Sequence, residues 1–210
     1  MANTAVEFYT SHKEIYQKKV SGISKKIRLF AWYRLFAFLL IFAPLFIYGW
    51  EGWKTVIPSA VFMILFFLLV KKNIQFEKQK KAYQVLEKLS TDELRALEHQ
   101  FSHFENGKEF LNPAHFNSYD LDLFGEGSLF QFINRTSTQS GRQKLAGWLQ
   151  NAFLSKSEIE QRQKAVRELA SQPEWRLNFL AKGHLFRESS EMSREIIQWS
   201  ETELNFNHPV

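Results

Sequence analysis

The stretch LFAFLLIFAPLFIYGWEGWKTVIPSAVFMILFFLLV, residues 35–70, contains two runs of 16 residues without a charged side chain, separated by a short link that holds Glu51 and Lys54. A helix that crosses the core of a bilayer requires roughly 20 mostly apolar residues, with about 17 at the lower end. Residues 29–33 lengthen the first run if the Arg34 side chain extends to the interface. The stretch therefore predicts a transmembrane hairpin of two helices, with a buried pair of core helices as the alternative.

Side chains around the two runs predict which way the hairpin faces. Aromatic residues lie near the ends of the runs, where lipid–water interfaces favour them, at Trp32, Tyr33, Tyr48, Trp50 and Trp53. Basic residues flank the outer ends at Lys18, Lys19, Lys25, Lys26, Arg28, Lys71, Lys72, Lys78, Lys80 and Lys81. Because cytoplasmic flanks carry the excess of lysine and arginine, we expect both termini in the cytoplasm and residues 49–54 outside. The expected location is the plasma (inner) membrane, with lipid as a partner.

The distribution of charge favours this membrane hypothesis over binding of nucleic acid. The chain carries a net charge of +5. Residues 1–81 hold 13 Lys and Arg against 4 Asp and Glu, a net of +9, while residues 82–210 hold 14 against 18, a net of −4. A surface that binds phosphates would place the basic excess on the soluble part. The absence of cysteine excludes disulfides, thiolate metal sites and cysteine nucleophiles.

Residues 1–27 are predicted to form an amphipathic helix ahead of the hairpin, which occupies residues 28–72. Its apolar positions recur at three- and four-residue steps, at Phe8, His12, Ile15, Tyr16, Ile23 and Ile27. Two alternatives remain open for this helix. It lies at the interface, held by anionic lipid, or it packs on the soluble domain.

A helical connector is predicted over residues 73–118. The second span continues as a charged helix to residue 89, and Ser90 with Glu93 forms a capping box that starts a new helix ending near Phe104. Residues 105–128 are rich in Gly, Asn and Pro and are expected to be a connection with one extended piece over residues 119–124.

Helix signals dominate residues 119–210, which we expect to form a helical domain. Thr138 is predicted to cap one helix, Ser155 and Glu158 form a second capping box, and Pro173 suits a first helical position. A further amphipathic helix is marked by Met192, Ile196 and Trp199. No long segment alternates with a period of two, so the fold class is all-α.

The sequence YDLDLFGEGSLFQFINRTSTQSGRQKLAGWLQ, followed by EIEQRQKAVREL, resembles the start of the core, or lever, domain of the MutS family of DNA mismatch-repair ATPases. The matching residues are Leu121, Leu123, Gly127, Ser128, Leu129, Arg135, Thr136, Thr138, Gly141, Trp148, Leu149, Arg162, Gln163, Ala165 and Val166. The resemblance covers about a quarter of the chain, and its specificity comes from the order and spacing of the pieces. It implies an incomplete lever-like helical domain behind the transmembrane hairpin.

In the family this region joins the ATPase to the DNA clamp and transmits nucleotide-dependent motion, so the resemblance implies structural roles for its residues. Those residues are Arg135, Thr136, Thr138, Gly141, Trp148, Arg162 and Gln163. We expect Thr136 and Thr138 to accept bonds from free amides at a helix start, and Gly141 to allow close approach of helices. Arg135 is expected to bind carbonyls or a carboxylate such as Asp120 or Asp122, with a DNA phosphate as the functional alternative.

The sequence also departs from the family pattern. The amino-terminal mismatch-reading domain has no counterpart, and no Gly-x-x-x-x-Gly-Lys-Ser/Thr loop is present. We therefore assign no catalytic, cofactor-binding or metal-binding residue to this chain, and expect ATP and Mg²⁺ only at a carboxy-terminal domain beyond Val210. The full-length protein is expected to be a homodimeric MutS-like ATPase that contacts DNA outside this segment. The alternative is a non-enzymatic membrane scaffold that binds a protein partner through the helical domain.

Three other candidate sites carry weaker signals. His99 and His103 have zinc-ligand spacing if they lie on one helix, but no third ligand is evident. Asp120 and Asp122 would share one side of an extended segment, which suits a functional carboxylate pair, but solvated acids at a strand edge are the usual case. Asn134 starts an Asn-Arg-Thr glycosylation pattern that the expected cytoplasmic location rules out.

Overall fold

The computed structural model describes residues 2–50, 52–111, 121–151, 155–186 and 198–199. These residues form helices, turns and loops, and no strand occurs among them, which confirms the predicted all-α class. The chain divides into two compact units, Met1–Leu94 and Arg95–Val210. The helices are α1 (Ala2–Tyr48), α2 (Trp53–Leu97), the 3-10 turn η1 (Lys108–Phe110), α4 (Leu129–Ile133), α5 (Gln139–Gln150), α6 (Lys156–Ala170) and α7 (Pro173–Leu185).

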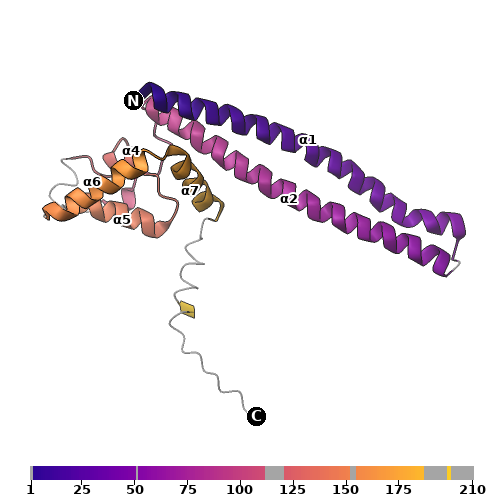
Figure 1. Ribbon diagram of the computed structural model, residues 1–210. Helices are drawn as coiled ribbons and strands as arrows, with labels where there is room; N and C mark the ends of the chain where they lie inside the picture. Colours follow the sequence, from indigo (N-terminus) through magenta and orange to yellow (C-terminus); the bar gives the residue numbers. More distant parts are fainter. Residues whose placement is uncertain (1, 51, 112–120, 152–154, 187–197, 200–210) are drawn as a thin grey trace, which may run out of the picture. The chain divides into compact units, whose positions relative to one another are not determined.

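The first unit is a hairpin of two long helices. Figure 1 shows α1 and α2 side by side in opposite directions, joined by a short link at one end. With 47 residues at about 1.5 Å each, α1 is about 70 Å long, more than twice the roughly 30 Å of a bilayer core. Pro44 and Pro58 both lie inside the helices. The predicted amphipathic helix is the first part of α1 and continues into the apolar run without a break.

The two helices of the hairpin pack along a continuous seam. Less exposed positions recur at alternating steps of four and three, at Tyr16, Val20, Ile23, Ile27, Phe30, Arg34, Ala37, Ile41 and Pro44 on α1 and at Ser59, Phe62, Phe66, Leu69, Asn73, Phe76, Lys80 and Tyr83 on α2. This is the heptad spacing of a coiled coil. Rings of Tyr16 and Tyr83 stack with centroids 6.0 Å apart, and the Ser59 hydroxyl donates to the Ile41 carbonyl at 2.9 Å.

The seam shows which side chains of the amphipathic pattern in residues 1–27 face α2. Tyr16 is 7% exposed, and Ile23 and Ile27 also lie in the seam, whereas Ile15 points away and is 45% exposed. The face that includes Tyr16, Ile23 and Ile27 is therefore turned towards α2.

The predicted helix start at Ser90 is wrong. Helix α2 runs through this position, because the Ser90 hydroxyl donates to the Leu86 carbonyl one turn earlier, at 2.8 Å. The helix ends beyond Leu97, where His99 adopts a φ of 61° and the Gln100 amide donates to the Arg95 carbonyl at 2.9 Å. That pattern is a Schellman motif with His99 in the left-handed position. His99 and His103 consequently do not share a helix face.

The second unit has its core around three phenylalanine rings. Phe130 is fully buried, and its ring centroid lies 5.4 Å from that of Phe124 and 5.6 Å from that of Phe110. Gly107, at a φ of 66°, lies directly against this core, since a Cβ there would lie 2.6 Å from Cδ1 of Phe130. The remaining core side chains are Leu111, Leu123, Leu145, Ala146 and Leu149.

The predicted extended piece over residues 119–124 is also wrong for its described part. Residues 121 and 122 form a turn, and Asp122 has a φ of 45°. The Leu129 amide then donates to the Asp122 carbonyl at 3.1 Å, which closes a loop onto the start of α4. Asp120 lies outside the described residues.

Helix starts in the second unit follow the sequence signals in part. Thr138 caps α5 as predicted, with its hydroxyl accepting from the Gly141 amide at 3.1 Å, and Pro173 is the first residue of α7. Helix α6 begins after Ser155 as predicted, but the Ser155 side chain makes no capping bond. The predicted helix marked by Met192 and Ile196 lies outside the described residues.

Candidate functional site

Two buried amide side chains hold the loop between α4 and α5 that carries the Arg-Thr-x-Thr motif. Gln131, 3% exposed, donates to the carbonyls of Ser102 at 3.2 Å and Phe104 at 2.8 Å, and accepts from the Gly127 amide at 2.8 Å. Asn134, 5% exposed, donates to the Glu105 carbonyl at 3.2 Å. Because buried polar groups are costly when unpaired, these bonds fix the loop to residues 102–105.

Arg135 lies flat against an aromatic ring. Its guanidinium carbon is 3.7 Å from the centroid of Phe104, and Nη1 donates to the carbonyls of Phe132 at 2.9 Å and Asn134 at 3.1 Å. The predicted carbonyl bonds are thus present. A guanidinium that stacks on a ring and binds carbonyls orders the backbone around it.

The two motif threonines have different partners. Thr138 caps α5, whereas Thr136 donates from both its amide, at 3.0 Å, and its hydroxyl, at 2.7 Å, to Oδ1 of Asn134. Thr136 therefore closes an Asx turn and does not cap a helix, which corrects the sequence expectation. At Gly141 the nearest atoms that a Cβ would meet are in the side chains of Thr138, at 3.0 Å, and Thr136, at 3.6 Å, so the close approach is to the motif loop and not to the second helix that was expected.

Helix α7 approaches the same loop through a glycine. A Cβ at Gly183 would overlap the Ser137 hydroxyl and lie 2.8 Å from its Cβ. The backbone of α7 consequently touches the residue between the two motif threonines. This contact could not be predicted, since no residue pattern around Gly183 indicates it.

Helix α5 is tied to the segment before the core by an ion pair. Arg142 binds the Glu105 carboxylate, and its Nε lies 3.7 Å from Oε1 of Glu109. Near the other end of α5, Gln150 donates to the Phe110 carbonyl at 3.1 Å. Half-exposed pairs of this kind add modest stability, but bonds from near both ends of α5 to residues 105–110 fix the direction of the helix.

Trp148 and Arg162 join α5 to α6. The Arg162 guanidinium carbon lies 3.6 Å from the centroid of the Trp148 ring, and Lys144 Nζ lies 6.0 Å from the same centroid. Both Trp148 and Arg162 are motif residues, and the structure brings them together across two helices. Cation–π contacts of this geometry stabilise by about 0.5–2 kcal/mol, depending on desolvation.

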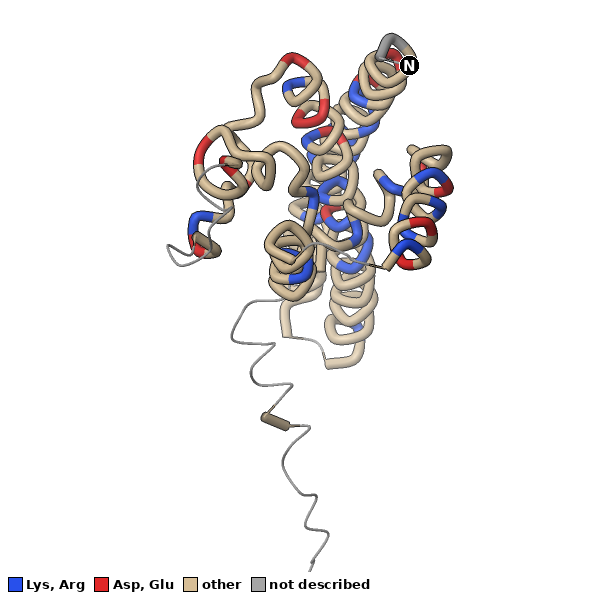
Figure 2. Tube along the Cα trace, turned by 90° about the vertical axis from the view of Figure 1, so that its left-hand side faces the viewer, with Lys and Arg blue, Asp and Glu red and all other residues tan. Residues whose placement is uncertain are grey.

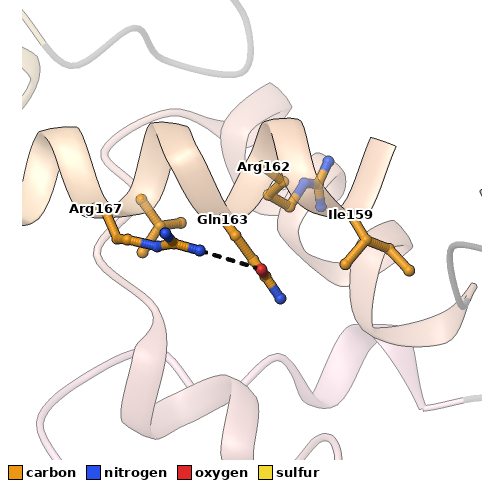
Figure 3. A pocket seen from close by; sticks show the side chains of 5 residues that line it. Ile159, Arg162, Gln163 and Arg167 are labelled. Carbon is orange, nitrogen blue, oxygen red and sulfur yellow. Dashed lines mark hydrogen bonds between the residues drawn. The ribbon is translucent and has the colours of Figure 1, made fainter. Parts of the chain in front are cut away.

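Side chains of α6 line an open hollow. Its lining is Ile159, Arg162, Gln163, Val166 and Arg167, all from one helix. Figure 3 shows Arg167 donating to Oε1 of Gln163, a bond of 3.3 Å. No residue of α6 is buried, so the hollow is a surface between side chains of one helix.

The motif side chains of the described residues contact the protein's own backbone and rings. They include no group of three or more His, Cys, Asp or Glu side chains that could hold a metal ion. The motif side chains bind backbone carbonyls, amides and rings, as the bonds above show. The arrangement locks a loop and three helices, α4, α5 and α7, to one another.

This helical domain, which contains the Arg-Thr-x-Thr loop, is matched in known proteins. The family described as MutS domain III matches residues 92–198, which are 107 of the 210 residues. The chain therefore belongs to the MutS family through this domain.

A similar protein is the DNA mismatch repair protein MSH3 of Vanderwaltozyma polyspora. It is 35% identical over 96 residues, which cover 43% of this chain and 9% of that protein. The chain thus spans about a tenth of the length of this relative. No solved structure matches the chain. The resemblance stated from the motif is confirmed by both comparisons, and the family match begins at residue 92, within α2.

Proposed function

We propose that this chain is the membrane-anchored part of a MutS-like protein, in which α1 and α2 are the anchor and the second unit is the lever scaffold of an ATPase domain. The observation that carries the proposal is a family lever domain on the same chain as two helices that are long and apolar enough to cross a membrane.

Exposure of the hairpin supports the anchor. In the most apolar stretch of α2 no residue is buried, and the corresponding share for α1 is 11%. Phe46 is 88% exposed and Phe67 63% exposed. If the two helices stood alone in water, these apolar side chains would be exposed to solvent. In a membrane, lipid tails would cover them on all sides. The alternative of a buried helical pair requires a cover that the described residues do not supply.

Contacts of the second unit support the scaffold role. Arg135, Gln131 and Asn134 hold the loop to backbone carbonyls, and Trp148 with Arg162 couples α5 to α6. Such a unit transmits displacement because its parts move together. We propose that ATP, Mg²⁺ and DNA are bound by other parts of the full-length protein, that this protein is a homodimer, and that it acts in a process related to mismatch repair. Both termini of the chain face the cytoplasm at the plasma (inner) membrane.

A second candidate function is a non-enzymatic membrane scaffold that binds a protein. The observation in its favour is an exposed aromatic pair on α7, where Trp175 and Phe179 stack with centroids 5.0 Å apart and are 50% and 64% exposed. Exposed apolar side chains of this size are common at protein interfaces.

Extraction from membranes tests the anchor. The expressed chain should stay with the membrane fraction after alkaline carbonate treatment. Leu39 and Leu65 are 56% and 43% exposed near the middle of the apolar runs, so L39K/L65K should shift the chain to the soluble or aggregated fraction, because each lysine costs about 2.5–3.5 kcal/mol at the centre of a bilayer. L121K, at a leucine exposed to 62% outside the hairpin, is the control and should not change the partition. Release of the unmodified chain by carbonate would overturn the anchor.

A further inference from the structure

Basic side chains on the hairpin are concentrated beside the apolar runs. Residues 18–34 contain six Lys and Arg and no acid, and residues 71–81 contain five Lys and one acid, Glu77. The two segments together carry 11 basic residues against one acidic residue, a net of +10. Figure 2 shows Lys and Arg (blue) along one half of the long hairpin, while the half that ends at the link between α1 and α2 is mostly tan.

These cations have no acidic partners within the described part of the chain. Ion pairs in the described residues include those of Arg142 and Lys156, which lie in the second unit and not among these cations. Lys19 lies over the rings of Tyr16 and Tyr83, 5.2 Å from each centroid, and Lys72 lies 5.6 Å from the centroid of Phe76. A concentration of cations without acidic partners attracts anions from outside the hairpin.

Because α1 and α2 are continuous helices, the cations can be divided by their distance along the axis from the apolar runs. Lys25 lies four residues before Leu29, and Lys72 two residues after Val70, so both are within about 6 Å along the axis. Lys18 and Lys81 each lie 11 residues away, about 16 Å along the axis, because α1 and α2 are helical throughout these segments. The Debye length at physiological salt is about 8 Å, so the second group is largely screened from a membrane surface.

We propose that Lys25, Lys26, Arg28, Lys71 and Lys72, here named the basic collar, form a binding surface for the phosphate-bearing headgroups of anionic phospholipids. The proposal rests on the proposed membrane anchor and adds a preference among lipids. The helices beyond the collar form a stalk in water, held by the Tyr16 and Tyr83 stack. Lys13, Lys18, Lys81 and Lys88 lie on this stalk and contribute little to lipid binding.

Lipid selectivity measured by electron paramagnetic resonance tests the collar. The full chain is reconstituted in phosphatidylcholine bilayers with a trace of spin-labelled phosphatidylglycerol or spin-labelled phosphatidylcholine. We expect the motionally restricted component to favour phosphatidylglycerol by about fivefold or more, the effect of one fully engaged lysine. K25Q/K26Q/K71Q/K72Q, which leaves Arg28 in place, should lower this preference. K13Q/K18Q/K81Q/K88Q removes the same number of charges and should retain it.

Different results of this experiment would contradict different parts of the proposal. Equal association of both lipids with the unmodified chain would overturn the collar while leaving the anchor in place. Equal loss in the two quadruple variants would overturn the division between collar and stalk, since net charge alone would then explain the preference. A spectrum without any restricted component would show that the hairpin is not in the bilayer, which overturns the anchor and the collar together.

Discussion

The guanidinium of Arg162 on α6 covers the indole ring of Trp148 on α5, with 3.6 Å between the guanidinium carbon and the ring centroid. Both residues belong to the motif by which the sequence resembles the MutS family. The contact joins two helices that are separated in sequence by a segment outside the described residues. Their pairing gives a physical role to two motif positions that have no reactive chemistry.

Replacement of Arg162 by glutamine should therefore destabilise the chain. The loss of the cation–π contact is expected to cost about 0.5–2 kcal/mol, seen as a lower melting temperature of the detergent-solubilised protein. Lys164 is exposed on the same helix, and K164Q is the matched control that should melt like the unmodified chain. If R162Q and K164Q melt at the same temperature, the contact does not contribute to stability.

Gly107 should not tolerate alanine. A Cβ there would lie 2.6 Å from the buried Phe130 ring, and the φ of 66° is itself unfavourable for other residues. We expect G107A to lose about 1–3 kcal/mol by overpacking, with additional strain from the backbone. Gly147 lies in α5 with open space around it, so G147A should be neutral or stabilising. Equal melting temperatures for G107A and the unmodified chain would contradict the core packing described.

The contact of α7 with the motif loop predicts a rescue. G183A should destabilise the chain because its new methyl group overlaps the Ser137 hydroxyl. S137G removes that hydroxyl and its Cβ, so G183A/S137G should melt above the value expected from adding the two single changes. Additive effects of the two substitutions would mean that α7 does not rest on this loop.

The chain alone should neither hydrolyse ATP nor bind DNA tightly. It lacks a phosphate-binding loop, and residues 82–210 carry a net charge of −4, which repels a polyanion. Fluorescence anisotropy with matched and mismatched duplexes at roughly physiological salt, together with an ATPase assay, measures both properties. Weak retention at low salt fits the basic flanks of the hairpin. Submicromolar binding with a preference for the mismatch, or nucleotide turnover above a purified blank, would place recognition or catalysis in this chain.

Local signals in the sequence predicted elements whose causes are local. The two uncharged runs predicted the hairpin, and Thr138 predicted the start of α5 because a cap needs only the next three residues. Ser90 gave the same kind of signal and misled, since a serine inside a helix can donate to the carbonyl one turn earlier, as it does to Leu86. Sequence alone does not distinguish these two uses of a hydroxyl.

Partners that are distant in the chain could not be predicted. Gln131 and Phe104 are 27 residues apart, and Arg142 and Glu105 are 37 residues apart. Asn134 was considered only as a glycosylation acceptor, although its burial and its bonds make it a central residue of the loop. A polar residue between apolar neighbours on a short helix, as at Gln131, is the one signal that could have indicated a buried amide.

The orientation of the hairpin is the most direct test of the membrane anchor. The chain has no cysteine, so W50C, at a side chain 91% exposed in the link between α1 and α2, gives a single reactive site. K164C on α6 is the matched site in the second unit. With a membrane-impermeant maleimide, W50C should be labelled in intact cells and K164C only after lysis. Labelling of W50C only after lysis would contradict a hairpin that crosses the membrane with both ends in the cytoplasm.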